Sequence, residues 1–417
     1  MTPFLRSRGR RTDTKTSTGF DSPYSWRVII LTLIITSLSF GAVTSVPILL
    51  KPIAAEWAQG VRPISLIHMS AMLGASVGSL VLGRVVDRFG FFRIAVVGAF
   101  ATAGGVTLAA HATDLLTLHI AYGLLVGGLG QAAFFSPIAA ESSRWFCRRR
   151  PFAVAVAACG QSVGGVVAPL LLRTLEAAYG WRTALLIYGN VAAFAILICA
   201  LVFRRAAPGF AGRPSVEKGG PPLTSRDIRQ LLLLCIALGL SALSTFVVIG
   251  HLTSYGEEQG LPPRLSATLL SILLGSALFS RLSVSAMLTR WGSIRVLVAL
   301  SAIHWLGITV LAMSGGLVST SIGAILIGFG FGGYLPTYAV VLSNIFPPHQ
   351  AGRRISEVYS LVFLMAGLGS LLGGVFRDNT GSYTSSFCLA SLSSGVALLV
   401  LGAVHLLSRA RSDGVQV

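Results

Sequence analysis

One arginine lies where a charged side chain is costly. Arg281 sits well inside the stretch Leu265–Trp291, which is otherwise apolar there and long enough to cross a bilayer as a helix. It is the only Lys or Arg in the chain that falls deep within an apolar span. A guanidinium in hydrocarbon is strongly destabilised, so we expect Arg281 to face a cavity and to bind an anionic ligand there.

A structural role for Arg281 is the alternative, because a buried acid could neutralise it. No Asp or Glu lies in the middle of an apolar span. The nearest are Glu141 and Glu357, which lie at the ends of their spans. An anion that comes and goes is therefore the favoured partner.

Two tyrosines in a glycine-rich stretch, Gly328–Tyr338, offer hydroxyls for the same ligand. Tyr334 and Tyr338 are four residues apart and share one helix face. They could donate hydrogen bonds to a carboxylate opposite Arg281, or they could serve only in packing between helices. Three amides are weaker candidates of the same kind: Gln131, Gln161 and Asn190.

The composition is that of an integral membrane protein. Of the 417 residues, 53% are hydrophobic and 11% are charged. Twelve apolar spans have the length of a membrane helix, near residues 27–50, 64–86, 94–112, 115–137, 152–172, 183–203, 228–250, 265–289, 296–314, 317–343, 356–376 and 384–407. We expect an all-α membrane protein with twelve transmembrane helices and the lipid bilayer as its surroundings. No nucleophile–base set, paired acids or metal cluster appears in the spans, so we expect neither an enzyme nor a cofactor.

The basic residues define an orientation. With both termini inside, the inner segments hold 24 Lys and Arg and the outer segments hold 6. This distribution accounts for the net charge of +18 without a nucleic-acid partner. We expect a multi-pass protein of the cytoplasmic (inner) membrane, with both termini cytoplasmic.

The chain divides into two halves. The longest polar connection, 204–227, is rich in Pro, Gly and basic residues and is typical of a linker. The predicted divisions are a tail at 1–26, six helices at 27–203, the linker, six helices at 228–407 and a tail at 408–417. An internal repeat supports this division, since Arg88, Gly90 and Arg93 recur at a constant offset of 202 as Arg290, Gly292 and Arg295. Two pseudo-symmetric six-helix halves with a site between them are typical of secondary transporters.

The first copy of that repeat resembles a known loop motif. Gly83, Asp87, Arg88, Gly90 and Arg93 have the spacing of the loop between the second and third helices of the major facilitator superfamily. The resemblance implies the major facilitator fold and a latch between the halves on the cytoplasmic side. The alternative is an ordinary basic inner loop. In the second copy Thr289 and Ser285 replace the aspartate and the first glycine, so only the first copy is expected to latch strongly.

A second stretch resembles the monocarboxylate transporters and their oxalate/formate-exchanger relatives. Trp145–Ala153 leads into Ala158–Gly164, as the corresponding loop and fifth helix do in that group. The resemblance implies that Arg281 receives a substrate carboxylate. It also implies that Thr44 stands where the group's mammalian members have a first-helix lysine, so we expect Thr44 to be a substrate contact as well. Ala277 replaces their proton-carrying aspartate, so a coupled proton would ride on the substrate or on another group such as His304.

These observations predict a secondary active transporter that works by alternating access. Its expected partner is a small organic anion, a monocarboxylate above all, with a coupled proton or counter-anion, and it is expected to be a monomer. Two alternatives stay open: an efflux carrier for drugs or metabolites, and a non-transporting membrane sensor on the same scaffold.

Overall fold

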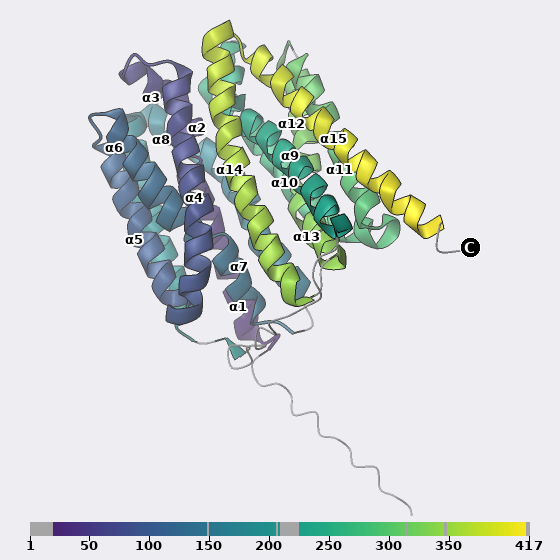
Figure 1. Cartoon of the computed structure of the whole chain (residues 1–417). Helices are drawn as coiled ribbons and strands as arrows, with labels where there is room; N and C mark the ends of the chain where they lie inside the picture. The colour runs from purple at the N-terminus through teal and green to yellow at the C-terminus, as the bar shows by residue number, and fades with distance from the viewer. Residues whose placement is uncertain are drawn as a thin grey trace, which may run out of the picture.

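The computed structural model describes residues 20–147, 150–205, 207–208, 225–313, 315–345 and 348–413 (Figure 1). The described part is a bundle of long helices. The first half holds α1 (Pro23–Val43), α2 (Ser45–Ile48), α3 (Leu50–Glu56), α4 (Val61–Phe89), α5 (Phe91–Ala110), α6 (Leu115–Ile120), η1 (Ala121–Gln131), α7 (Ser136–Ser143), α8 (Arg150–Ala200) and η2 (Leu201–Arg204). The second holds α9 (Ser225–Glu258), α10 (Pro263–Trp291), α11 (Ser293–Ala312), α12 (Leu317–Gly332), α13 (Tyr334–Ile345), α14 (Pro348–Thr380) and α15 (Tyr383–Asp413).

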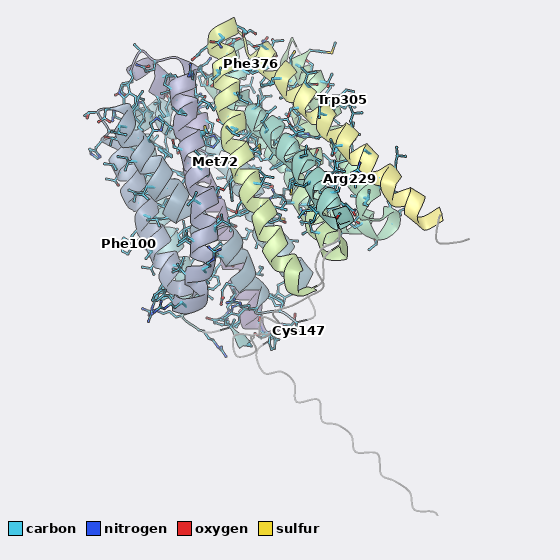
Figure 2. The ribbon with its side chains drawn as sticks, in the orientation of Figure 1. Met72, Phe100, Cys147, Arg229, Trp305 and Phe376 are labelled. Atoms are coloured by element: carbon cyan, nitrogen blue, oxygen red, sulfur yellow. The ribbon has the colours of Figure 1, made fainter. Side chains whose placement is uncertain are left out.

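These elements make the predicted twelve crossings. Within the described residues, ten helices are long and apolar enough to span a membrane, and Leu115–Gln131 is a shorter apolar helix. Large apolar side chains such as that of Phe100 on α5 point outward from the bundle, as a lipid-facing surface requires (Figure 2). One of the ten, Ala155–Arg204, is two helices joined at Gly180, where the backbone leaves helical geometry. The all-α fold predicted from the sequence is therefore confirmed.

The helices are mostly longer than the apolar spans that predicted them. The first begins at Pro23, inside the predicted tail 1–26, and α15 continues to Asp413, inside the predicted tail 408–417. Polar end turns form helix as readily as apolar ones, and hydropathy does not detect them. Most of the predicted linker 204–227 lies outside the described residues, so the domain limits stay a prediction.

A single glycine turns the chain at equivalent places in the two halves. Gly90 alone separates α4 from α5 and Gly292 alone separates α10 from α11, with φ of +79° and +77°. A left-handed backbone at these φ values is open to glycine at little cost. The repeat found in the sequence thus corresponds to one repeated turn.

The two halves meet along their length. In Figure 1 the purple-to-blue helices of the first half lie beside the green-to-yellow helices of the second, and α4 runs alongside α14. Helix α8 packs against α10 in the same way. Because both described termini of the bundle lie at one end, we call that end the terminal end. The other, which carries the α3–α4 and α14–α15 connections, is the distal end.

Small residues let the helices within a half approach closely. A Cβ at Gly127 in η1 would lie 2.1 Å from the carbonyl oxygen of Ala71 in α4. Glycine at position 127 therefore permits the close packing of η1 against α4. The π-helical turns of η1 carry the chain to Gln131, whose side chain takes part in the site described next.

Candidate functional site

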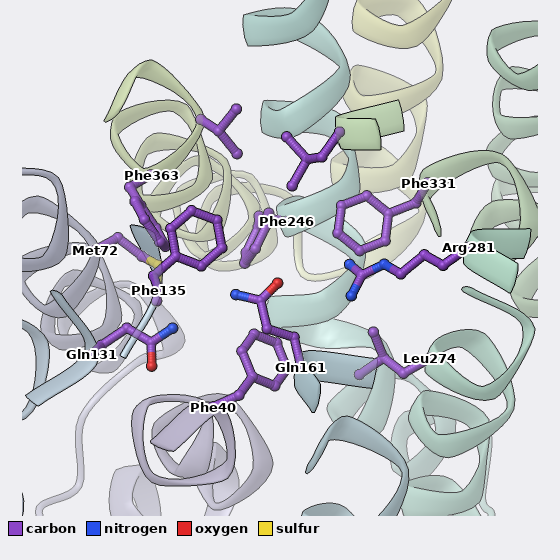
Figure 3. A pocket seen from close by; sticks show the side chains of 12 residues that line it. Phe40, Met72, Gln131, Phe135, Gln161, Phe246, Leu274, Arg281, Phe331 and Phe363 are labelled. Carbon is purple, nitrogen blue, oxygen red and sulfur yellow. The ribbon is translucent and has the colours of Figure 1, made fainter. Parts of the chain in front are cut away.

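A small cavity of about 20 Å³ lies between the two halves (Figure 3). This volume holds about one water molecule. Its lining is largely apolar and comes from both halves: Phe40, Met72, Gln131, Phe135, Gln161, Phe246, Leu274, Arg281, Phe331, Leu335, Val362 and Phe363. Arg281 is the one charged side chain of this lining.

The Arg281 guanidinium points into this cavity (Figure 3). Its side chain is only 5% exposed. Nη1 donates a hydrogen bond to the carbonyl of Ala158, and the guanidinium carbon lies 5.8 Å from the centre of the Phe331 ring. Nε has no hydrogen-bond partner among the described residues.

No carboxylate of the described residues forms an ion pair with Arg281. Glu141, one of the two acids weighed from the sequence, pairs instead with Arg144 at 2.8 Å. The side chain of the other, Glu357, is outside the described part. The carbonyl of Ala158 carries a partial charge only, so the guanidinium keeps hydrogen-bonding capacity for an anion.

The segment Ala158–Gly164 singled out in the sequence supports Arg281 directly. It belongs to α8, and Arg281 bonds to its first residue. A Cβ at Gly164 would lie 2.1 Å from the carbonyl oxygen of Ser37 in α1, so glycine permits the close approach of these helices. The next residue, Gly165, makes similar room for Leu274 of α10. These contacts bring α8 close to α10 beside Arg281.

Two of the amides considered from the sequence line the cavity. Gln161 points its amide toward the middle of the cavity and Gln131 lies on the opposite wall from Arg281 (Figure 3). The Gln131 Oε1 accepts a hydrogen bond of 2.7 Å from the Ser39 hydroxyl. Asn190 lies elsewhere, exposed, and donates to Thr107 and to the Leu186 carbonyl.

The other predicted ligand contacts are not in the lining in this conformation. Tyr334 and Tyr338 are 2% and 1% exposed, and the Tyr334 ring lies 5.3 Å from the ring of His304. The Thr44 hydroxyl donates to the carbonyl of Phe40, one turn back on the same helix segment, at 2.7 Å. Their role as substrate contacts stays a prediction.

His304 has a structural environment. It is fully buried within the second half, where Nε2 lies 2.9 Å from the Thr245 hydroxyl and Nδ1 lies 2.9 Å from the Ser394 hydroxyl. Both ring nitrogens are therefore hydrogen-bonded. Both hydrogen bonds stay within the second half, as expected of a structural histidine.

Five phenylalanines of the cavity were missed by sequence reasoning. Phe40, Phe246, Phe331 and Phe363 come from four different helices, and Phe135 comes from the turn before α7. No spacing in the sequence relates them, because the fold alone brings these segments together. Phe40 alone had a local indication of its place in the site, because it lies one helical turn before Thr44, a predicted substrate contact.

The predicted latch lies at the terminal end of α4. Gly83, Arg88 and Arg93 are exposed, and Gly90 forms the turn described above. The Arg88 guanidinium lies 5.4 Å from the centre of the Phe89 ring. The side chain of Asp87 is outside the described part, so the latch between the halves stays a prediction.

A buried ion-pair cluster joins the halves at the distal end. Arg173 of α8 is 2% exposed and donates through Nη2 to Glu257 of α9. Lys51 of α3 lies 3.4 Å from the same carboxylate, and Glu176 lies 3.6 Å from Arg173. Sequence reasoning placed Arg173 in an outer segment and missed its burial, because helix α8 continues past the apolar span.

A second distal contact uses a carboxylate and a helix N-terminus. Asp378 of α14 accepts hydrogen bonds from the backbone N–H groups of Val61 and Arg62, at 3.0 and 2.8 Å. These are the first residues of α4 in the other half, where N–H groups lack partners and the helix dipole favours negative charge. The distal end is thus closed by polar contacts between the halves.

Within the described residues, no group of three or more His, Cys, Asp or Glu side chains could hold a metal ion. The cavity presents one cation, two amides and an apolar wall, which suit the binding of a ligand. The residues of its lining include no nucleophile beside a base.

Comparison with known proteins agrees with this architecture. The chain is 27% identical to human Monocarboxylate transporter 11 over 391 residues, 89% of this chain and 80% of that protein. It is 28% identical to mouse Monocarboxylate transporter 4 over 400 residues, 91% of this chain and 83% of that protein. It is 26% identical over 395 residues to the MFS transporter asaE of Aspergillus flavus, covering 90% of this chain and 84% of that protein.

Solved structures share the fold. The nucleoside transporter NupG superposes with a TM-score of 0.72 at 13% identity, over 91% of this chain and 99% of that one. The human organic anion transporter MFSD10 superposes with a TM-score of 0.68 at 15% identity, over 91% of this chain and 100% of that one. The sequence profile of the Major Facilitator Superfamily matches residues 31–373, so the chain belongs to this superfamily of transporters and resembles its monocarboxylate transporter group.

Proposed function

We propose that this protein is a secondary active transporter that moves a small organic anion, a monocarboxylate above all, by alternating access. The observation that carries the proposal is Arg281. It is buried in the wall of a cavity between the halves, and no carboxylate of the described residues neutralises it. A carboxylate ligand would supply the missing negative charge. Its oxygens would accept hydrogen bonds from the guanidinium N–H groups that do not bond to Ala158.

The cavity also limits the kind of anion. One cation suits one carboxylate, and the amides of Gln131 and Gln161 can bond its oxygens or a further polar group. The remaining wall is apolar and mostly aromatic, which suits a short hydrocarbon body. The names of the monocarboxylate transporters among the relatives support the same substrate class.

The cavity is too small to hold a substrate unless the two halves move apart. About 20 Å³ accommodates one water molecule and no organic acid. A substrate therefore requires the halves to separate on one side, and ligand binding shifts the balance between such states. We place both termini in the cytoplasm and the chain in the inner membrane, from the 24 to 6 division of Lys and Arg. We assign the Gly83–Arg93 loop to a latch on that side, with Asp87 as its acid, and expect a monomer.

The test is uptake of labelled lactate, pyruvate and related acids into proteoliposomes. A charge-assisted hydrogen bond to a buried group contributes about 3 kcal/mol, so Arg281→Gln should raise KM roughly 100-fold. Arg281→Lys keeps the charge but loses the forked geometry and should have an intermediate effect. Arg264→Gln is the matched control, since Arg264 is an exposed arginine in the first turn of the same helix α10. Saturable uptake with the wild-type KM in Arg281→Gln would refute the role of Arg281.

One observation favours a second candidate. Five phenylalanines in the cavity wall could also accept a bulky amphipathic compound, as an efflux carrier for drugs or metabolites would require. Overexpression in a growth-inhibition panel distinguishes the two candidates. An efflux carrier protects cells against amphipathic compounds, whereas a monocarboxylate carrier alters growth on organic acids only.

A further inference from the structure

Two buried histidines, one from each half, meet at a single serine. His68 lies on α4 and His251 on α9, and both are fully buried. The His68 Nδ1 lies 2.9 Å from the hydroxyl of Ser370 on α14. The His251 Nε2 lies 2.8 Å from the backbone carbonyl oxygen of the same serine.

These contacts leave each imidazole with an unused nitrogen. A carbonyl only accepts hydrogen bonds, so His251 carries its proton on Nε2 and has a lone pair on Nδ1. That Nδ1 has no hydrogen-bond partner among the described residues, and neither has Nε2 of His68. Because a buried polar atom without a partner is destabilising, the two nitrogens indicate a role beyond packing.

Two glycines on the surrounding helices make room for this histidine pair and its serine. A Cβ at Gly373 of α14 would lie 2.4 Å from Cδ2 of His251, and a Cβ at Gly250 of α9 would lie 2.9 Å from the Ser370 hydroxyl. Glycine at both positions makes room for the imidazole and the serine. His304 differs, because both its nitrogens are bonded within one half.

The pair lies between the cavity and the distal end. His68 is one helical turn from Met72 of the cavity wall, and its ring stacks on that of Phe246, also of the wall, at 6.4 Å. His251 faces Tyr383 of α15, with ring centres 5.4 Å apart, and Asp378 lies beyond Ser370 on α14, nearer the distal end. Asp378 already bonds the N-terminus of α4.

We propose that His68 and His251 form a proton-binding site that couples protonation to opening of the distal end and to movement of the anion. This proposal rests on the transport function proposed above. Within the closed interface, a proton on either ring would be a buried charge, and the carboxylate of Asp378 already accepts hydrogen bonds from the N-terminus of α4. Once the halves separate distally, water reaches both rings, so protonation stabilises the open state relative to the closed one.

The anion completes the coupling. Arg281 gives the cavity one positive charge, and a proton on the histidine pair adds a second when no substrate is bound. A carboxylate bound at Arg281 offsets the second charge and allows the protonated carrier to close. Proton and anion therefore raise each other's affinity by the same factor.

The first test measures the conformation without substrate. Spin labels at Thr113 and Gly315, exposed distal positions of the two halves, report opening as a longer distance in pulsed electron resonance. They are placed in a background in which the exposed Cys147 and Cys388 are serine. Wild type should shift toward the longer distance from about pH 8 to about pH 5, the range of imidazole titration. His68→Gln/His251→Gln should lose this shift, and His119→Gln, whose ring bonds Ser70 within the first half, should keep it.

The second test separates this proposal from the transport function. In proteoliposomes, the double variant should retain exchange of labelled for unlabelled substrate but lose accumulation driven by a pH gradient. Full gradient-driven accumulation in the double variant, or an unchanged pH-dependent distance, would overturn the histidine site. Absence of any carboxylate exchange in the wild type would instead overturn the proposed transport function, and the distance measurement would still decide the histidine site.

Discussion

The ion-pair cluster at the distal end predicts how far one substitution should move the protein between conformations. Glu257→Gln removes the carboxylate that Arg173 and Lys51 share. Arg173 is 2% exposed when the end is closed, so the substitution leaves its charge buried with only Glu176, at 3.6 Å, as a partner. In an open conformation the same guanidinium would be in water, so the cost falls on the closed state alone.

The magnitude follows from that asymmetry. Removing one partner of a buried ion pair costs about 3–5 kcal/mol. Glu176 compensates in part, so we take the lower value, about 3 kcal/mol, which changes the open-to-closed ratio by about two orders of magnitude. A protein that is about 99% closed distally would then populate both states about equally.

The assay is the distance between spin labels at Thr113 and Gly315. Glu258→Gln is the matched control, because the adjacent Glu258 pairs with Arg377 of α14 inside the second half, at 2.8 Å. That pair persists whether the halves separate or not, so its loss should leave the distance unchanged. Adding Arg173→Leu to Glu257→Gln removes the uncompensated charge and should restore closure.

A distance distribution in Glu257→Gln equal to that of wild type and Glu258→Gln would refute the reasoning. The cluster would then contribute equally to both states, as an exposed ion pair does.

Two further predictions concern stability. Gly127→Ala should lower the melting temperature in detergent, because its Cβ would lie 2.1 Å from a backbone carbonyl oxygen and overpacking costs about 1–3 kcal/mol. Gly104→Ala is the control: a Cβ there would meet nothing within 4 Å, so this variant should leave the melting temperature unchanged or raise it. Equal melting temperatures of the two variants would contradict the close-packing argument. Glu56 at the distal end accepts hydrogen bonds from Arg182, which lowers the pKa of its carboxyl. Its contribution to stability is therefore present above its pKa in the unfolded chain and lost as pH falls through its lowered folded-state pKa. Glu56→Gln should thus be less stable than wild type at neutral pH and equal to it in acid; a gap in melting temperature that persists in acid would argue against the ion pair.

The sequence by itself determined the architecture. In a bilayer, every spanning segment must satisfy its own backbone hydrogen bonds, so apolar length alone predicts helices and their number. Arg88, Gly90 and Arg93 recur as Arg290, Gly292 and Arg295, and this repeat was visible in the sequence because glycine adopts the positive φ of the one-residue turn at little cost. Arg281 was identified from the sequence because the free-energy cost of a charge in hydrocarbon follows from the apolar residues on either side of it, which the sequence shows. Helix ends were predicted less well, since polar turns continue α8 and α15 beyond their apolar spans.

The tertiary structure decided which side chains share a site. The five phenylalanines and Gln131 meet Arg281 only because helices far apart in the sequence are packed together, and no local pattern encodes that. The same is true of Arg173 with Glu257 and of His68 with Ser370, because the two members of each pair lie in opposite halves of the chain. The sequence shows directly which residues carry a charge or a lone pair, but not which residues are their partners. The partners depend on which helices become neighbours, and the sum of many weak contacts between the two halves determines that arrangement.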